Sequence, residues 1–126
     1  MDRRIEQILF LMEQGLDQHW SESDLARAVN LSSWRLCHLF KTEIGVAPLR
    51  YLREIRLERA KRLLETTFLS VKQIRCMVGI KDGSHFVRDF KRKYGLAPTP
   101  HRAQFGDITR NSRLGHQIAK LAIKKK

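Results

Sequence analysis

The sequence predicts an all-α protein, and two observations support this fold class. Apolar residues recur at intervals of three and four along nearly all of the 126 residues, and no stretch alternates as a half-buried strand does. The segment FKTEIGVAP, residues 40–48, also returns fifty residues later as FKRKYGLAP, residues 90–98. A chain that repeats itself in this way is expected to build one small helical unit twice.

The first unit is expected to begin with a helix whose apolar stripe consists of Ile5, Ile8, Leu9, Met12 and Leu16. Ser21 with Asp24 matches a capping box and predicts a short helix over residues 22–28. Asn30 stands where a residue of left-handed conformation ends such a helix. After this tight turn, a second helix is predicted over residues 33–44.

The second unit repeats this order after a connecting helix, which is predicted over residues 49–66 because Pro48 suits a first helical turn. A short helix over residues 71–78 follows, and Gly79 takes the position that Asn30 holds in the first unit. The remaining predicted elements are a helix over residues 83–94 and a short last helix that begins at Pro98.

Each unit is a helix-turn-helix, because a short helix, a tight turn and a second helix bury their apolar faces together at a steep angle. The chain therefore divides into a first helix-turn-helix subdomain (1–48), a connecting helix (49–66), a second helix-turn-helix subdomain (67–104) and a basic C-terminal tail (105–126). The tail has apolar residues at helical spacing, Leu114, Ile118, Leu121 and Ala122. They leave three alternatives open: a solvated tail, a phosphate-contacting arm or a small packing helix.

Positive charge is concentrated after the first helix. The formal net charge is +12, made up of −4 over residues 1–24, +11 over residues 25–104 and +5 over residues 105–126. This distribution predicts a polyanionic partner, nucleic acid ahead of an acidic membrane. The longest apolar run, Ile8–Met12, is far shorter than the ~20 residues of a membrane span, and no secretion signal is recognisable. Both cysteines lie in helical patterns, which favours a reducing cytoplasm.

No catalytic residue, metal site or cofactor is predicted, and the chain is expected not to be an enzyme. The residues that invite a metal or nucleophile interpretation are Cys37, His38, Cys76, His85 and His101. Cys37 and His38 diverge by about 100° on one helix, so they do not easily share a metal. The sequence has no Gly-rich phosphate loop and no carboxylate pair that would indicate another chemistry.

The outer faces of the two second helices carry the residues expected to contact a nucleic acid. The predicted base-reading residues are Trp34, Cys37, His38, Ser84, His85 and Arg88. The predicted phosphate contacts are Ser33, Arg35, Lys41, Lys91 and Arg92. Arg88 is singled out because its guanidinium offers the two-donor geometry that guanine accepts. The alternatives are that Trp34 is a partly buried packing residue and that the histidines and Ser84 only decorate the surface.

In this ordered pattern the sequence resembles the DNA-binding region of the AraC/XylS family of bacterial transcription regulators, over about residues 5–104. The strongest part is SHFVRDFKRKYGLAPTPHR, residues 84–102, which is close to the family signature. LARAVNLSSWRLCHLFKTEIGVAP (25–48), YLREIRLERAKRLL (51–64) and the segment Ile74–Gly79 fit in the same order.

The resemblance implies a homeodomain-like fold with two reading helices in adjacent major-groove segments on one face of promoter DNA. It also implies a regulator, either an activator or a repressor, that binds as a monomer, contacts RNA polymerase and works at the nucleoid in the bacterial cytoplasm, with no effector site in this chain. The connecting helix agrees with this arrangement, because 18 residues extend about 27 Å and, with flanking turns, suit a spacing of about one DNA turn, ~34 Å.

Three residues of the second unit depart from the family pattern: Arg75, Ile80 and Gly83. Arg75 stands where the first unit has the small Ala26, so its side chain is expected to snorkel past the helix pair or to loosen it. Gly83 is expected to weaken the start of its helix. The first unit, through Trp34 and His38, is therefore predicted to supply most of the sequence discrimination.

The rival hypothesis is a nonspecific, charge-driven binder of nucleic acid or acidic membrane. A third alternative is a thiol-dependent DNA alkyl acceptor, but Cys37 has no orienting base partner in the sequence pattern. If Met1 is the natural start, the abundance of the protein is expected to set its activity. If the chain is a fragment, a sensor domain is expected upstream.

Overall fold

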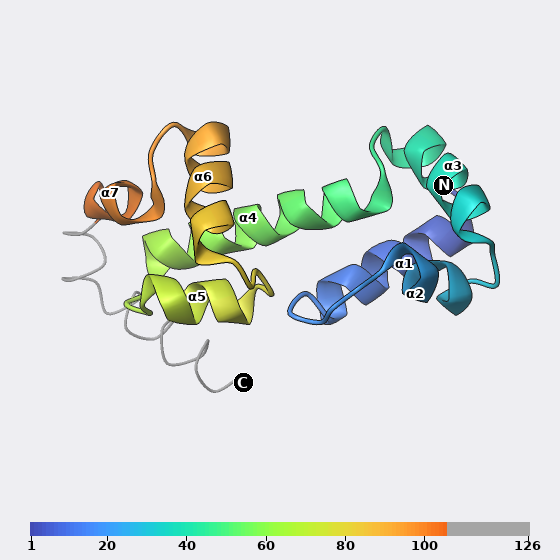
Figure 1. Cartoon of the computed structure of the whole chain (residues 1–126), viewed down its shortest axis with the longest axis horizontal. Helices are drawn as coiled ribbons and strands as arrows, with labels where there is room; N and C mark the ends of the chain where they lie inside the picture. The colour runs from blue at the N-terminus through green and yellow to red at the C-terminus, as the bar shows by residue number, and fades with distance from the viewer. Residues whose placement is uncertain (106–126) are drawn as a thin grey trace. The chain divides into compact units, whose positions relative to one another are not determined.

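The computed structural model describes residues 1–105, and every regular element in that range is an α-helix. In chain order the helices are α1 (Arg3–Gln14), α2 (Glu22–Ala28), α3 (Ser33–Ile44), α4 (Pro48–Thr66), α5 (Val71–Met77), α6 (Gly83–Tyr94) and α7 (Pro98–Ala103) (Figure 1). The predicted all-α fold class is confirmed. The apolar positions noted in the tail, Leu114, Ile118, Leu121 and Ala122, lie outside the described residues.

The chain forms two compact units, one from Met1 to Arg56 and one that begins at Leu57, so that the boundary falls within α4. The core of the first unit is made by Ile5, Ile8, Met12, Leu16, Leu25, Ala26, Val29, Leu36, Phe40 and Leu52, all buried. The core of the second unit is made by Leu57, Ala60, Leu64, Leu69, Ile74, Val78, Phe86 and Phe90. Each unit thus has an apolar core of its own.

Both predicted capping boxes are present. The Ser21 hydroxyl accepts from the Asp24 amide (3.0 Å), and the Ser21 amide donates to the Asp24 carboxylate (3.1 Å). Ser70 and Gln73 make the same pair of hydrogen bonds at the start of α5. Because these bonds satisfy amides that have no partner within the helix, they fix where the first helix of each helix-turn-helix begins.

The two turns also have the predicted geometry. Asn30 has a φ of 57° and Gly79 a φ of 82°, both in the left-handed region. The next amide then returns to the last turn of the helix: Leu31 donates to the Ala26 carbonyl at 2.9 Å, and Ile80 donates to the Arg75 carbonyl at 3.0 Å. This pattern is the Schellman motif, and it sends the chain from the short helix into the second one.

One half-buried arginine in each unit binds the end of that unit's first long helix. Arg56 donates from Nε to the Leu16 carbonyl (2.9 Å) and from Nη2 to the Gln18 carbonyl (2.6 Å). Arg102 donates from Nε to the Leu64 carbonyl (3.2 Å) and from Nη2 to the Thr67 carbonyl (3.2 Å). Burial lowers the pKa of both guanidinium groups, but arginine keeps its charge in proteins. The sequence analysis did not single out either residue.

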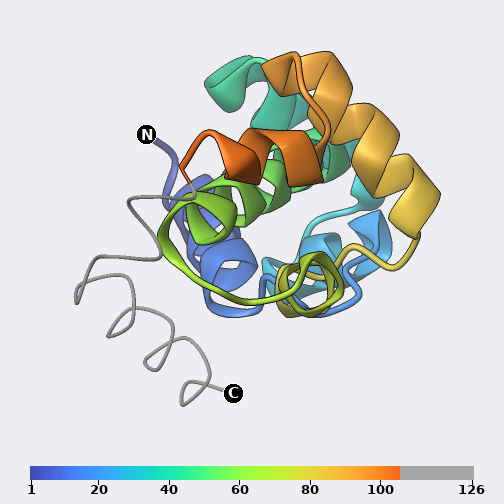
Figure 2. The ribbon, with the colours of Figure 1, turned by 90° about the vertical axis from the view of Figure 1, so that its left-hand side faces the viewer.

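Helix α7 packs beside the C-terminal end of α4, and His101 provides a second anchor there (Figure 2). The buried His101 ring lies 5.3 Å from the Phe90 ring, and its Nε2 is 2.8 Å from Glu65 Oε2. Burial acts to raise the pKa of Glu65, but hydrogen bonds from Lys61 and His101 outweigh it and hold this pKa below its usual value. The repeat places Tyr51 at the equivalent position of the first unit.

Candidate nucleic-acid interface

Trp34 and His38 form a pair on the outer face of α3, one helical turn apart. The Trp34 side chain is 70% exposed, and its ring meets the His38 ring edge to face with 3.9 Å between centroids. The inner face of the same helix buries Leu36 and Phe40 in the core of the first unit. The structure therefore excludes the alternative in which Trp34 is a partly buried packing residue, and it presents a rigid aromatic surface to solvent.

Cys37 is engaged inside the first unit. Its thiol is half-buried and donates a hydrogen bond to Glu22 Oε2 on α2 at 2.6 Å. Burial, reinforced by the Glu22 carboxylate, raises the pKa of Cys37 to about 11. The side chain is therefore a thiol at neutral pH, which argues against the alkyl-acceptor alternative because a reactive cysteine needs its thiolate. The thiol joins α3 to α2.

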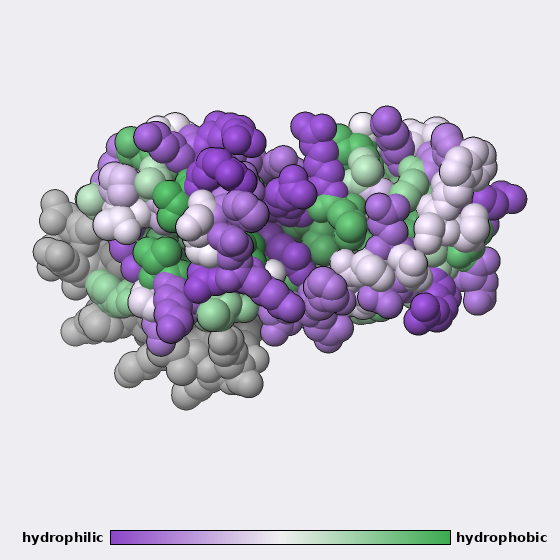
Figure 3. Space-filling model, viewed as in Figure 1, coloured by the Kyte–Doolittle hydropathy of each residue, from purple (hydrophilic) through white to green (hydrophobic). Residues whose placement is uncertain are grey.

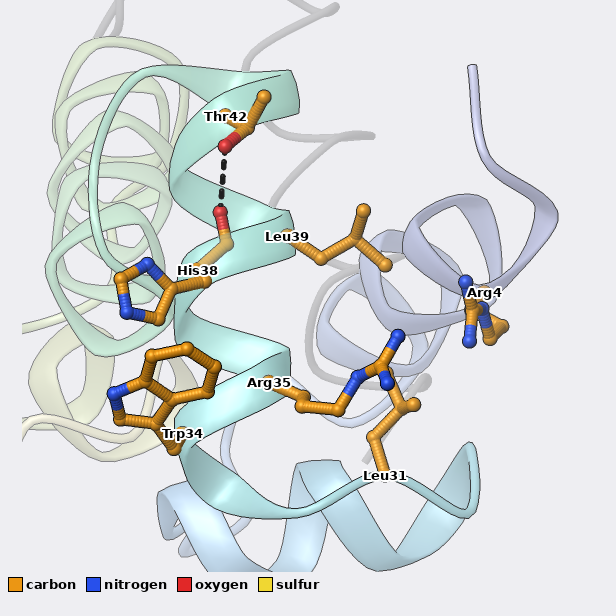
Figure 4. Close-up of a pocket in the computed structure, with 7 residues that line it drawn as sticks. All are labelled: Arg4, Leu31, Trp34, Arg35, His38, Leu39 and Thr42. Atoms are coloured by element: carbon orange, nitrogen blue, oxygen red, sulfur yellow. Dashed lines mark hydrogen bonds between the residues drawn. The ribbon is translucent and has the colours of Figure 1, made fainter.

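The predicted phosphate contacts of the first unit flank the Trp34–His38 pair. Arg35 and Lys41 are exposed on α3, and Ser33 is half-buried at its first position. Arg35 also lines a shallow groove that Arg4 of α1 completes (Figure 4). No sequence pattern marks Arg4, because a basic residue in an acidic segment gives no signal of its place in the fold.

The outer face of α6 exposes Ser84, His85 and Arg88. Asp82 caps the helix by accepting from the His85 amide at 2.9 Å, and its other oxygen is 3.8 Å from His85 Nδ1. Asp89 lies 3.9 Å from Arg88 Nε. Exposed ion pairs of this length are worth little, so the Arg88 guanidinium keeps its donors available for another acceptor.

The C-terminal half of α6 adds cationic residues to this face. Lys91, Arg92 and Lys93 all lie in the last turn of the helix, and hydrophilic side chains gather over this end of α6 (Figure 3). Cations at a helix C-terminus are stabilised by the helix dipole. Two of them, Lys91 and Arg92, are the phosphate contacts predicted for the second unit.

Arg75 is accommodated without displacing the helix pair. Its Nη1 donates to the Ile80 carbonyl at 3.0 Å and also to the Lys81 carbonyl, so the guanidinium crosses the turn between α5 and α6. A Cβ at Gly83 would lie 3.6 Å from Arg75 Nε, which is an ordinary contact. Of the two predicted alternatives, the structure shows a snorkelling side chain that ties the turn down rather than one that loosens it.

Among residues 1–105 no helix is long and apolar enough to cross a membrane, and no cluster of three or more His, Cys, Asp or Glu side chains is placed to hold a metal. The described geometry therefore consists of two exposed helix faces with aromatic, histidine and arginine side chains. Each face is held by a capped, hydrogen-bonded turn.

Comparisons with known proteins bear on this geometry. Residues 25–104 match the helix-turn-helix domain family. The arabinose operon regulatory protein of Salmonella typhimurium is 33% identical over 104 residues, which are 82% of this chain and 37% of that protein. The chain spans about a third of the length of the curated relatives it matches.

Two solved structures are similar over most of the chain. A transcriptional regulator with an AraC-type DNA-binding domain from Chromobacterium violaceum is 33% identical, with a TM-score of 0.74, covering 82% of this chain and 92% of that one. The DNA-binding domain of AdpA, a global transcriptional factor solved with a target DNA, shares the fold at 24% identity, with a TM-score of 0.80, covering 86% of this chain and 98% of that one. The double helix-turn-helix, its family match and the two relatives at 33% identity show that the chain belongs to the AraC/XylS family of transcription regulators.

Proposed function

We propose that this protein binds a specific sequence in promoter DNA and regulates transcription, with α3 and α6 as the helices that enter the major groove. One observation carries the proposal: each unit presents the second helix of a helix-turn-helix with side chains suited to base edges directed to solvent. A recognition helix is used in this way, with its outer residues against the bases and its inner residues in the core.

The proposed roles of individual side chains follow from their exposure and chemistry. Base reading is assigned to Trp34 and His38 on α3 and to Ser84, His85 and Arg88 on α6. Phosphate contacts are assigned to Ser33, Arg35, Lys41, Lys91 and Arg92. Cys37 is instead assigned to holding α3 against α2, because its thiol already donates to Glu22. Hydrogen bonds to phosphates fix register, and contacts to base edges provide sequence information.

We further propose that the protein acts as a monomer, contacts RNA polymerase and resides at the nucleoid of a bacterial cell. Two reading helices in one chain support monomeric binding, because a second copy is not needed to supply a second half-site contact. Family membership supports a role in transcription, and the similar arabinose operon regulatory protein comes from a bacterium. We also propose that residues 1–48 and 67–104 act as the two DNA-binding subdomains and that residues 49–66 connect them.

The test is to select binding sites from a random DNA pool and to footprint the selected site in excess competitor DNA. Sequence-specific regulation requires a protected segment that persists as competitor is added. Uniform protection that is lost with salt would instead support the charge-driven binder, because phosphate contacts alone carry no sequence preference.

Arg88→Ala is expected to weaken binding to the selected site by about 1–3 kcal/mol and to relax the preference at one base pair, because a two-donor contact to guanine is lost. The measurement is the dissociation constant for the selected duplex and for duplexes changed at single positions. Arg88→Lys is the matched control that keeps the charge without the two-donor geometry. A loss of equal size on every sequence would identify Arg88 as a phosphate contact.

The affinity of the unmodified protein is expected to fall steeply with salt. Two docked units are expected to neutralise about five to eight phosphates, which gives a slope of about −4.5 to −7 for the logarithm of the binding constant against the logarithm of salt concentration. Fluorescence anisotropy of the selected duplex at several salt concentrations measures this slope. A slope near about −2 would mean that only one unit engages the DNA.

A further inference from the structure

A shallow groove of about 330 Å³ lies on the outer side of α3, beside the Trp34–His38 pair. Six of its lining residues come from α3 and the turn before it, at helical spacing: Leu31, Trp34, Arg35, His38, Leu39 and Thr42. The seventh is Arg4, from the first turn of α1. In Figure 4 Arg35 extends from α3 toward Arg4, so the groove continues from the proposed reading face to the start of α1.

The lining of the groove matches the chemistry of a nucleic-acid backbone. Arg4 and Arg35 supply two guanidinium groups, and the half-buried Leu31 and Leu39 supply an apolar surface between them and the helix. A phosphate with its attached deoxyribose has the complementary parts, an anionic group that arginine recognises and a largely apolar ring. The charge therefore selects an anion, and the leucines favour one that carries a sugar.

The position of the groove fits the same occupant. A helix with its side chains is about 10–12 Å across and the major groove is about 12 Å wide, so residues on the flank of a reading helix lie against the backbone. Arg35 is on that flank of α3, adjacent in sequence to Trp34. Arg4, in the first turn of α1, lines the same groove as Arg35.

The Arg4 guanidinium is held in one place by the Asp2 carboxylate. Its Nε donates to Asp2 Oδ1 at 3.2 Å and its Nη2 to Asp2 Oδ2 at 3.0 Å. Hydrogen bonding to Arg4 holds the pKa of Asp2 below its usual value, so the carboxylate stays ionised at neutral pH. These two bonds use two of the five guanidinium N–H donors and leave three for a phosphate. A side chain held in place loses less conformational freedom on binding.

We propose that Arg4 and Arg35 form a binding site for the DNA backbone. One phosphate lies between the two guanidinium groups, and its deoxyribose lies over Leu31 and Leu39. Helix α1 thereby takes part in DNA binding, although the segment that contains it carries a net negative charge. This inference rests on the proposed function, because the duplex must lie against α3 for its backbone to reach the groove.

The test uses the whole chain and compares Arg4→Ala with Arg3→Ala, its neighbour on α1. Arg3 is exposed and lies outside the groove, so its removal makes the same change in charge. Arg4→Ala is expected to weaken binding about five- to tenfold at about 0.1 M salt, alike for the selected and random duplexes, and to make the salt slope shallower by about 0.9. Arg3→Ala is expected to change affinity less than about twofold.

Equal effects of Arg4→Ala and Arg3→Ala would overturn the proposed backbone-binding site. The proposed function would still stand if the unmodified protein prefers its selected site over random DNA. Absence of that preference in the unmodified protein would contradict the proposed function itself. Arg4→Lys should restore the slope, since it keeps the charge. If Arg4→Ala unfolds the first unit, Arg4→Gln serves instead, because it removes the charge but can still donate to Asp2. Arg4→Gln must then make the salt slope shallower by the same amount. An unchanged salt slope would overturn the proposed backbone-binding site.

Discussion

Arg102→Ala is expected to lower the free energy of unfolding of the second unit by about 2–3 kcal/mol. The guanidinium donates to two carbonyls at the end of α4, those of Leu64 and Thr67. Hydrogen bonds from a charged group are worth about 1.5–3 kcal/mol each, and water replaces part of this at a half-buried site. Urea unfolding followed by far-UV circular dichroism measures the change. The free energy of unfolding of Arg102→Lys is expected to lie between those of the unmodified protein and Arg102→Ala.

The first unit offers an internal comparison. Arg56→Ala should destabilise that unit by a similar amount, and both tryptophans, Trp20 and Trp34, report on it because they lie before residue 57. Trp20 is the better probe, since its half-buried indole donates to the Gly15 carbonyl at 2.9 Å. Tryptophan fluorescence should therefore shift for Arg56→Ala and stay unchanged for Arg102→Ala. If the unfolding transitions measured by tryptophan fluorescence and by circular dichroism shift together in both variants, the two units do not unfold separately. The exposed Arg62→Ala is the control, expected within about 0.5 kcal/mol.

Arg75→Ala is expected to lower the stability of the second unit by about 1–2 kcal/mol and to weaken sequence discrimination in the half-site that α6 reads. The substitution removes the donor that joins the Ile80 and Lys81 carbonyls across the turn. A less firmly held turn leaves α6 free to adopt more orientations, so its side chains meet base edges less often in the productive geometry. This expectation follows the first of the two alternatives drawn from the sequence, a snorkelling Arg75, and is the reverse of what the second, a loosened helix pair, would give.

Duplexes mutated in one half-site at a time measure this effect, together with the unfolding curve of each variant. Arg75→Ala should reduce the penalty for base changes under α6 and leave the penalty under α3 unchanged. Arg75→Lys can reach only one of the two carbonyls well. Its penalty for base changes under α6 should lie between those of the unmodified protein and Arg75→Ala. Increased discrimination under α6 in Arg75→Ala would show that Arg75 loosens the pair, which is the second of the two alternatives drawn from the sequence.

The sequence predicted the elements that depend on local signals. Helices α2, α3 and α6 have the predicted ends, because hydroxyl or carboxylate caps and left-handed turn residues act within four residues of the position they fix. The fold class and the family followed from these elements in order. Helix α5 ends at Met77, one residue before the predicted end, which is the usual uncertainty of a helix terminus.

Contacts between distant residues could not be predicted. Arg56 reaches carbonyls about forty residues away in the sequence, and any residue type provides such a carbonyl, so no pattern marks the acceptor. The bond from Cys37 to Glu22 and the place of Arg4 beside α3 depend on packing between helices. The base-reading and phosphate assignments stay predictions, since they depend on a partner molecule.

The main-chain hydrogen bonds of Arg56 and Arg102 have a consequence for the substitutions that this protein tolerates. The hydrogen bonds described above for Arg56 and Arg102 go to main-chain oxygens, so they require that the chain follow a given path but do not depend on which side chains accompany these carbonyls. All twenty amino acids keep the carbonyl group, proline included. These hydrogen bonds therefore persist when a residue that supplies one of the carbonyls changes, although the buried Leu16 and Leu64 are also held by the cores. The arginine itself has no equivalent substitute.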